Sequence, residues 1–211
     1  MTTTRRLSLA YLALTVGVAV LFALNLFWGS VSLTPGAVAA ALLGRGEDAL
    51  AVGIVLQLRL PRAVMVVLLG AALSAAGYLL QTFFANPIAG PFVMGVSSGA
   101  KLAVALTMVV FLQRGLLTSS ATLIIAAFAG PISFVGIAGP HLVKNLLGSA
   151  KPLYVLPGCC LGGAAFCLLC DLIARSLFAP TELSISSVTA VFGAPVVIWL
   201  LVRRQTQEGR E

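Results

Sequence analysis

Residues 58–100 read LRLPRAVMVVLLGAALSAAGYLLQTFFANPIAGPFVMGVSSGA, and this stretch decides the fold class. It opens with Arg59 and Arg62 on either side of a Leu-Pro pair and then carries no formal charge before Lys101. Small residues and two proline-containing breaks interrupt the apolar run. Soluble domains contain about 25% charged residues, so this composition indicates a protein that lies within a membrane.

The whole chain has the same character. Of its 211 residues, 60% are hydrophobic and 9% are charged, and the mean hydropathy is +1.08. We therefore predict an all-α, polytopic integral membrane bundle with broken helices, in contact with membrane lipid. The net charge of +7 orients loops by the positive-inside rule and does not indicate a nucleic-acid partner.

About six segments are expected to cross the bilayer, since one crossing takes about 20 helical residues. They cover residues 7–28, 61–84, 92–112, 116–143, 157–178 and 188–202. The segment 116–143 is broken at Gly130-Pro131 and at Gly139-Pro140-His141. If it makes a helix and a return instead of one net crossing, the count becomes seven and one segment must be inverted or fail to span.

The flanking charges predict where the ends lie. Arg5-Arg6 and Arg203-Arg204 place both termini in the cytoplasm. A cleavable signal peptide is the alternative reading of residues 7–28, but signal cores hold about 7–15 apolar residues and end at a small-residue site that is missing here. Residues 29–58 predict an extracytoplasmic loop with a short amphipathic helix at 37–43, and residues 144–154 predict a basic cytoplasmic loop.

Small and polar residues within the apolar segments suggest where helices meet. Gly70, Ala71, Ser74 and Gly77 are three, four and seven residues apart and form one stripe, on which another helix can approach closely. Gln81 lies near the far end of the same segment. Ser97, Ser98 and Gly99 can line a wet path or pack against a neighbouring helix.

Few residues offer other chemistry. Asp171 and Arg175 are four apart, which permits an ion pair on one helix face. The four cysteines, at 159, 160, 167 and 170, share one apolar segment without a histidine beside them, so we assign them to packing. His141 cannot form a metal site alone. We predict no metal, no cofactor and no catalytic residue, since H-E-x-x-H and phosphate-loop motifs are missing from the sequence.

A series of short motifs resembles the permease subunits of ABC importers for iron-siderophores, haem and vitamin B12, the FecCD-type family. The motifs occur in family order and cover nearly all of the chain after about residue 56. They are Arg59-Leu-Pro-Arg62, Gly70-Ala-Ala-Leu73, Asn86-Pro-Ile-Ala89, Gly95-Val-Ser-Ser-Gly-Ala100, Gly130-Pro-Ile-Ser-Phe-Val-Gly136, Gly139-Pro-His141, Leu156-Pro-Gly158, Asp171-Leu-Ile-Ala-Arg175, Glu182-Leu183, and Gly193-Ala-Pro195 with Trp199-Leu-Leu201.

The resemblance implies a transport subunit of the bacterial inner membrane that hydrolyses nothing itself. It implies a second permease copy or paralogue, two cytoplasmic ATPase subunits, and a periplasmic or lipid-anchored substrate-binding protein. In the family, arginines that match Arg59, Arg62 and Arg175 present positive charge at the outer face to glutamates of the binding protein. Such pairing suits the guanidinium group, which binds carboxylates bidentately.

The chain departs from the family in length. About ten helices, as in the family, need well over roughly 300 residues, whereas this chain has 211. We treat residues 1–211 as one transmembrane permease domain with an internal deletion near residues 111–118. The alternative hypothesis is a non-transporting membrane scaffold of the same family that cannot couple to ATP hydrolysis. A small secondary transporter is disfavoured because Asp171 is the only intramembrane acid.

Overall fold

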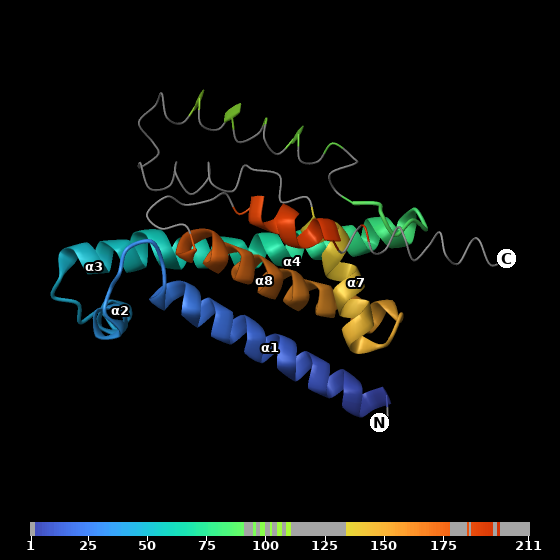
Figure 1. The fold of residues 1–211 in the computed structure, drawn as a ribbon, viewed down its shortest axis with the longest axis horizontal. Coiled ribbons are helices and arrows are strands. Elements are labelled where there is room, and N and C mark those ends of the chain that lie inside the picture. The colour runs from blue at the N-terminus through green and yellow to red at the C-terminus, as the bar shows by residue number, and fades with distance from the viewer. Residues whose placement is uncertain are drawn as a thin grey trace.

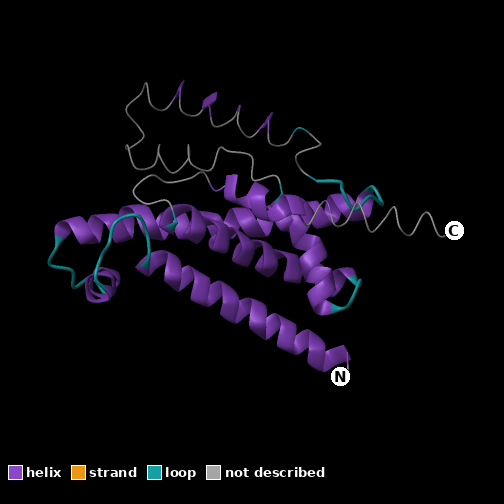
Figure 2. Ribbon diagram, viewed as in Figure 1, coloured by secondary structure: helices purple, strands orange, loops and turns teal. Residues whose placement is uncertain are grey.

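The computed structural model describes residues 3–90, 95, 98–99, 102, 105–106, 109–110, 134–177, 185, 187–195 and 198. Within these residues all regular structure is helical and no strand occurs (Figure 2), which confirms the all-α prediction. The predicted crossing at 92–112 lies largely outside the described residues, and the break at Gly130-Pro131 and the C-terminus lie outside them. Of the predicted crossing at 188–202, residues 188–195 and 198 are described.

Three described helical segments are long and apolar enough to span a membrane, namely Arg5–Phe27, Ala49–Phe83 and Pro152–Ser176. They belong to α1 (Thr3–Phe27), to the run that ends with α4 (Leu60–Phe83), and to α8 (Pro152–Ser176). Helix α8 packs against α1, α4 and α7 (Val135–Leu147), and α1 lies at the edge of the group (Figure 1). Leucine and valine side chains of α1 remain exposed, as expected of a helix that faces lipid: Leu9, Leu12, Val16 and Val20.

The bundle has two distinct ends, which we name by their elements. The N-terminal end holds the start of α1, the end of α4, and the connection from α7 to α8 (Figure 1). The α2 end holds the end of α1, the short helix α2 (Pro35–Leu42), the start of α4 and the end of α8. Helix α2 matches the predicted short helix, and the Thr34 side chain caps it by accepting a hydrogen bond from Ala37 N at 3.3 Å.

The predicted start of the second crossing is wrong by about twelve residues. Helix α3 (Ala49–Gly53), the π-helix η1 (Ile54–Arg59) and α4 follow one another without a break, so residues 49–58 are helix and not loop. Pro61 lies inside this continuous run. The Leu60 N–H bonds to the Val55 carbonyl in the wider π turn, and this gives room to the proline ring, which would clash with a carbonyl in a regular α-helix.

The predicted stripe of small residues on α4 is the contact face of the bundle. Gly70, Ser74 and Gly77 are buried. A Cβ atom on Gly70 would lie 2.5 Å from the Gly163 carbonyl oxygen of α8, and one on Gly77 would lie 1.8 Å from the Gly136 carbonyl oxygen of α7. Only glycine therefore permits the observed approach of α4 to both neighbours.

The predicted break at Gly139-Pro140 is also wrong, because α7 continues through Pro140. A proline within a helix leaves the carbonyl four residues earlier, here that of Gly136, without its usual donor. The Gln81 side chain of α4 supplies one: its Nε2 donates to Gly136 O at 3.2 Å and to Ile137 O at 3.4 Å. A neighbouring helix thus repairs the ladder, as membrane proteins require.

The connection after α7 is shorter than predicted. Helix α7 ends at Leu147 and is capped by Gly148 in the left-handed conformation, with φ 61°. Helix α8 then begins at Pro152, and Pro157, which the sequence suggests as the start of this crossing, lies inside it. The predicted loop 144–154 therefore reduces to residues 148–151.

Candidate functional site

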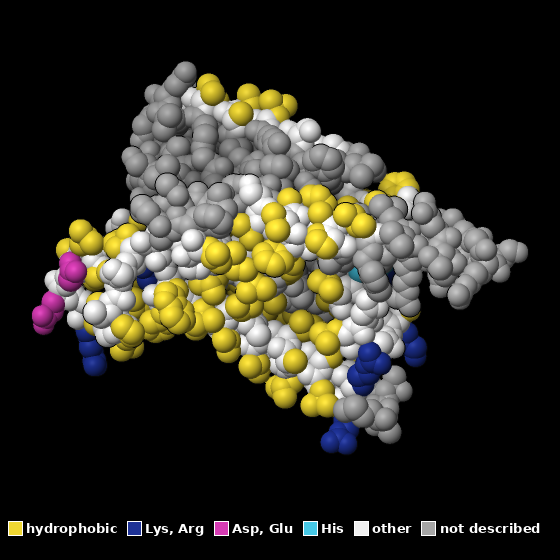
Figure 3. Space-filling model, viewed as in Figure 1, with side chains coloured by type: hydrophobic (Ala, Val, Ile, Leu, Met, Phe, Trp, Pro, Cys, Tyr) yellow, Lys and Arg dark blue, Asp and Glu magenta, His cyan; other side chains and the backbone are white. Residues whose placement is uncertain are grey.

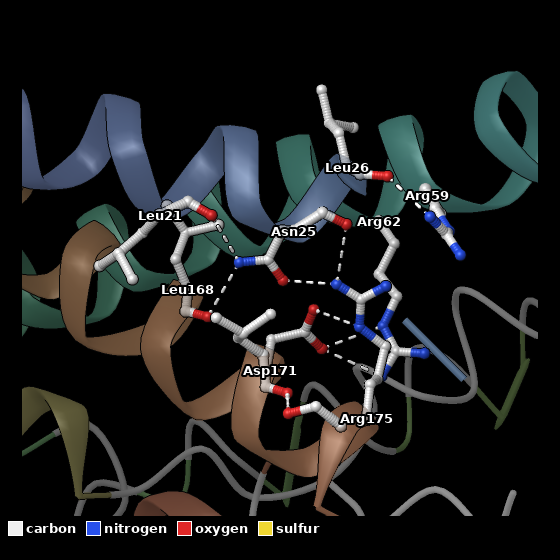
Figure 4. A network of polar contacts seen from close by, with 10 residues as sticks. Leu21, Asn25, Leu26, Arg59, Arg62, Leu168, Asp171 and Arg175 are labelled. Atoms are coloured by element: carbon white, nitrogen blue, oxygen red, sulfur yellow. Dashed lines mark hydrogen bonds and ion pairs between the residues drawn. The ribbon is translucent and has the colours of Figure 1, made fainter. Parts of the chain in front are cut away.

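A polar network joins three helical segments at the α2 end of the largely apolar bundle (Figure 4). Asn25 comes from α1, Arg59 and Arg62 from η1 and α4, and Asp171 and Arg175 from α8. We call these five residues the arginine network. Sequence reasoning singled out four of them, and the structure brings all four together.

Asp171 is the centre of the network and is fully buried. Its Oδ1 accepts from Arg62 Nε at 3.0 Å and lies 3.0 Å from Arg62 Nη2. Its Oδ2 lies 3.1 Å from Arg175 Nε. The pair with Arg175 is the one that the spacing of four residues permits, whereas Arg62 is 109 positions away in the chain. One carboxylate thus holds two guanidinium groups from two helices, which stabilises a charge at a depth where an isolated charge is costly.

Asn25 orients the second arginine. Its Nδ2 donates to Leu21 O at 2.8 Å and to Leu168 O at 3.0 Å, which fixes the amide so that Oδ1 accepts from Arg175 Nη2. Arg175 Nη2 also donates to the Asn25 backbone carbonyl at 3.2 Å. Sequence reasoning missed Asn25, although a single amide in an apolar segment is a signal for a buried polar contact.

Arg59 caps the end of α1. Its Nη1 donates to Leu26 O at 2.8 Å and to Phe27 O at 3.0 Å, and its Nη2 donates to Val31 O. Carbonyls at a helix C-terminus lack intrahelical donors, and a cation there also interacts favourably with the helix dipole. A Cβ on Gly29 would lie 3.3 Å from both the Arg59 and the Arg175 guanidinium, so the turn after α1 lies directly against both groups.

The three arginines differ in accessibility. Arg59 and Arg175 are 4% and 3% exposed, whereas the Arg62 side chain is 16% exposed. Arg62 is therefore the most accessible of the three arginines in the described structure. The assignment of all three to binding-protein docking stays a prediction.

The remaining predicted site residues lie elsewhere. Gln81 is buried and bonded to α7, so its contacts are those of helix packing. Ser98 and Gly99 are exposed and helical, and Ser97 lies outside the described residues. His141 Nε2 lies 3.3 Å from Pro87 O, which ties α7 to the turn after α4. No group of three metal-ligating side chains occurs in the described part of the chain.

The described cysteines contribute to the interior. Cys159, Cys167 and Cys170 are buried on α8, Cys160 is half-buried, and all four are free thiols. Cys167 and Cys170 pack with Val66 of α4 and Leu168 of α8. This arrangement agrees with the packing role suggested by the sequence.

Comparison with known proteins gives matches along most of the chain. The model of the FecCD transport family matches residues 17–129 and 114–203. The vitamin B12 import system permease protein BtuC of Serratia proteamaculans is 27% identical over 317 aligned positions, which cover 91% of this chain and 92% of that protein. The hemin transport system permease protein HmuU of Yersinia pestis is 43% identical over 94 residues.

The match to HmuU covers 44% of this chain and 28% of the relative. BtuC of Escherichia coli is 48% identical over 77 residues, or 36% of this chain and 23% of that protein. A solved structure described as an inward-facing metal-chelate type ABC transporter superposes with a TM-score of 0.66 at 20% identity, covering 93% of this chain and 99% of that one, and supports the fold. The chain therefore belongs to the FecCD transport family of ABC importer permeases.

Proposed function

We propose that this chain is the permease subunit of an ABC importer that moves a metal chelate of the iron-siderophore type into the cytoplasm. A separate ATPase subunit supplies the energy, and a second permease copy or a paralogue completes the path. The protein lies in the bacterial inner membrane. Family membership supports the subunit type, and the arginine network supports the place at which the substrate arrives.

The charge distribution supports an orientation with the N-terminal end in the cytoplasm. Four exposed or half-exposed cations lie there, at Arg5, Arg6, Lys144 and Lys151. At the α2 end, the exposed charges of Arg45, Glu47 and Asp48 nearly cancel. In Figure 3, the acidic side chains visible among the described residues all lie at that end. By the positive-inside rule, the arginine network then faces the periplasm.

The network supplies the observation that carries the proposal. Arg62 Nε and Nη2 each lie 3.0 Å from Asp171 Oδ1, so the guanidinium is already oriented. The arginine side chain therefore loses little rotamer freedom when a carboxylate of a binding protein approaches. Charge-assisted pairs of this kind fix the orientation of two proteins and accelerate their encounter. Docking at this end would deliver the chelate to the outer mouth of the path.

The relatives support a metal chelate as the substrate class. Those named above import vitamin B12 and hemin, and the structural neighbour is of the metal-chelate type. Cobalamin, haem and ferric siderophores are all metals enclosed by an organic ligand. The family motifs are shared by permeases for all three kinds of chelate, and we propose the iron-siderophore type for this chain within that class.

A second candidate function is a membrane scaffold of the same family that does not transport. The alignment with the Serratia relative spans 317 positions and is longer than the whole chain. A long stretch of the relative therefore has no counterpart in this chain. The two family matches meet and overlap at residues 114–129. Both observations support one permease domain with an internal deletion near residues 111–118, which would remove part of the path and of the surface that contacts the ATPase.

One experiment separates the two functions. The chain is expressed with its binding protein and ATPase in a host that lacks its own permease, and uptake of labelled ferric siderophore, haem and cobalamin is measured. Transport predicts ATP-dependent uptake, greatest for the ferric siderophore, and co-purification of the ATPase. A chain that inserts into the membrane but neither retains the ATPase nor imports any chelate is the scaffold.

A further inference from the structure

A basic surface lies at the end of the bundle opposite the arginine network. It consists of Arg5 and Arg6 on α1, Lys144 on α7, and Lys151 just before α8. Figure 3 shows lysine and arginine side chains gathered near the N-terminus and next to hydrophobic side chains. We propose that this basic surface binds the phosphate headgroup of an anionic phospholipid as a specific site.

Arg6 is held in position before any ligand arrives. Its Nε donates to Leu146 O at 3.3 Å and its Nη2 donates to Asn145 O at 2.9 Å. The guanidinium also lies against Gly148, where an added Cβ would come within 2.6 Å of it. A guanidinium has five N–H donors, and the carbonyls at the end of α7 take two of them. The others are available to phosphate oxygens, which suit the planar fork of arginine.

The lysines extend the charge around Arg6. Lys144 is one residue before Asn145, and its Nζ lies 5.0 Å from the centre of the Tyr78 ring, in a cation–π contact. Lys151 is exposed at the start of α8. Described acidic side chains are absent from this end: Glu47 and Asp48 lie at the α2 end, and Asp171 lies in the arginine network.

The tyrosines mark the level of the membrane surface. The chain has three tyrosines, and all three lie at this end. The Tyr11 hydroxyl donates to Tyr154 O, which joins α1 to α8, and Tyr78 lies beneath Lys144. Tyrosine rings concentrate at the headgroup level of the bilayer because their bodies are apolar and their hydroxyls are polar. Tyr78 itself is buried, whereas Tyr11 is partly exposed and Tyr154 is 37% exposed. Tyr11 and Tyr154 therefore support a place for the basic surface at the depth of the lipid phosphates.

Apolar side chains beside the cations complete an amphiphilic site. Large aliphatic groups from three helices are at least 43% exposed: Leu9, Leu12, Leu142, Leu146 and Leu153. Acyl chains can cover these side chains while the phosphate meets Arg6 and the lysines. An acidic surface of a soluble protein would match the charge but would leave the leucines uncovered, so the combination favours a lipid.

The test uses the full chain in nanodiscs that contain equal parts of phosphatidylglycerol and phosphatidylcholine. Native mass spectrometry then counts the lipids of each kind that stay bound to the released protein. We expect preferential retention of phosphatidylglycerol, and a loss of about fivefold in its apparent affinity for each cation replaced. The variants are Lys144→Gln with Lys151→Gln, and Arg6→Gln. The matched control is Arg45→Gln, at the α2 end, which should retain phosphatidylglycerol as the wild type does.

Four results would overturn the proposal. Because Arg6 also bonds to α7, the effect of Arg6→Gln is interpreted only together with that of the lysine pair. Lys144 contacts the Tyr78 ring, so circular dichroism spectra are compared, and Lys151→Gln alone, at an exposed residue, serves as the variant without that contact. Equal retention of both lipids, or unchanged retention in the lysine pair, overturns the proposal. So does displacement of the lipid by inorganic phosphate at millimolar concentration, which would indicate a free-anion site, or loss of ATPase co-purification in the lysine pair with lipid retention intact.

Discussion

The contact between Gln81 and α7 makes a quantitative prediction about how this bundle tolerates a proline. The change is Gln81→Met, which keeps the length of the side chain and removes the amide. Gln81 Nε2 is the donor that reaches Gly136 O at 3.2 Å, the carbonyl that Pro140 leaves without a backbone partner. After the substitution this buried carbonyl has no donor from α4.

The expected cost follows from two terms. Leaving a buried acceptor unsatisfied costs about 1–3 kcal/mol, and hydrogen bonds between membrane helices contribute about 0.6 kcal/mol on average and up to about 1.7. Gln81 Oε1 is buried and has no hydrogen-bond partner among the described residues. Removal of this atom therefore offsets part of the lost stability. We expect a net destabilisation of about 1–2 kcal/mol, or roughly 2–8 °C in melting temperature for a chain of this size.

The matched background is Pro140→Ala. An alanine at position 140 has an N–H that can donate to Gly136 O within α7 itself, and it then replaces the function of Gln81. Thermal unfolding of the purified protein in detergent, followed by intrinsic fluorescence, is measured for both single variants and for the double variant. We predict that Gln81→Met costs clearly less in the Pro140→Ala background. An equal cost in both backgrounds, or no cost in the wild type, would refute the reasoning.

The other predictions concern close packing and the buried carboxylate. Gly77→Ala should strongly lower the melting temperature and the yield of folded protein, since its Cβ would lie 1.8 Å from a carbonyl oxygen of α7. The control Gly17→Ala, whose Cβ would have nothing within 4 Å, should be neutral or slightly stabilising. Equal effects of the two substitutions would contradict the packing role of the stripe. Asp171→Asn should cost about 3–5 kcal/mol because it removes the carboxylate from two guanidiniums. Arg62→Gln should cost less, because Arg175 still pairs with Asp171, and denaturant unfolding that gave the reverse order would contradict the network geometry.

Local periodicity in the sequence predicted much of the packing. The stripe through Gly70, Ser74 and Gly77 follows from helical spacing alone, and the structure places it against α7 and α8. The pairing of Asp171 with Arg175 follows from the same rule. Both features depend only on residues of one helix, which is why a pattern along the chain could reveal them.

The features that sequence reasoning missed depend on contacts between distant segments. Helix α7 continues through Pro140 because Gln81 of another helix satisfies the freed carbonyl, and no pattern within residues 116–143 contains that donor. The contact of Arg62 with Asp171 joins residues 109 positions apart. The π turn before Pro61 is a local feature instead, and it keeps residues 49–83 helical where the sequence analysis predicted a loop up to residue 58.

The exposure of the three arginines also refines the docking hypothesis. The sequence resemblance treats Arg59, Arg62 and Arg175 alike. In the structure, Arg59 caps α1 and Arg175 is bonded to Asn25, and both are buried. Replacement of either should therefore lower stability as well as docking, whereas Arg62 offers the cleaner test.

The most direct measurement is the affinity of the cognate binding protein for Arg62→Gln and Arg45→Gln permeases in nanodiscs, at low and at high salt. Arg45 lies at the same end but outside the network, so it controls for general charge. The account predicts that Arg62→Gln weakens binding about tenfold or more at low salt and flattens its salt dependence, while Arg45→Gln binds nearly as the wild type does. Unchanged binding in Arg62→Gln, or equal losses in the two variants, would contradict the claim that the network receives the substrate-carrying partner.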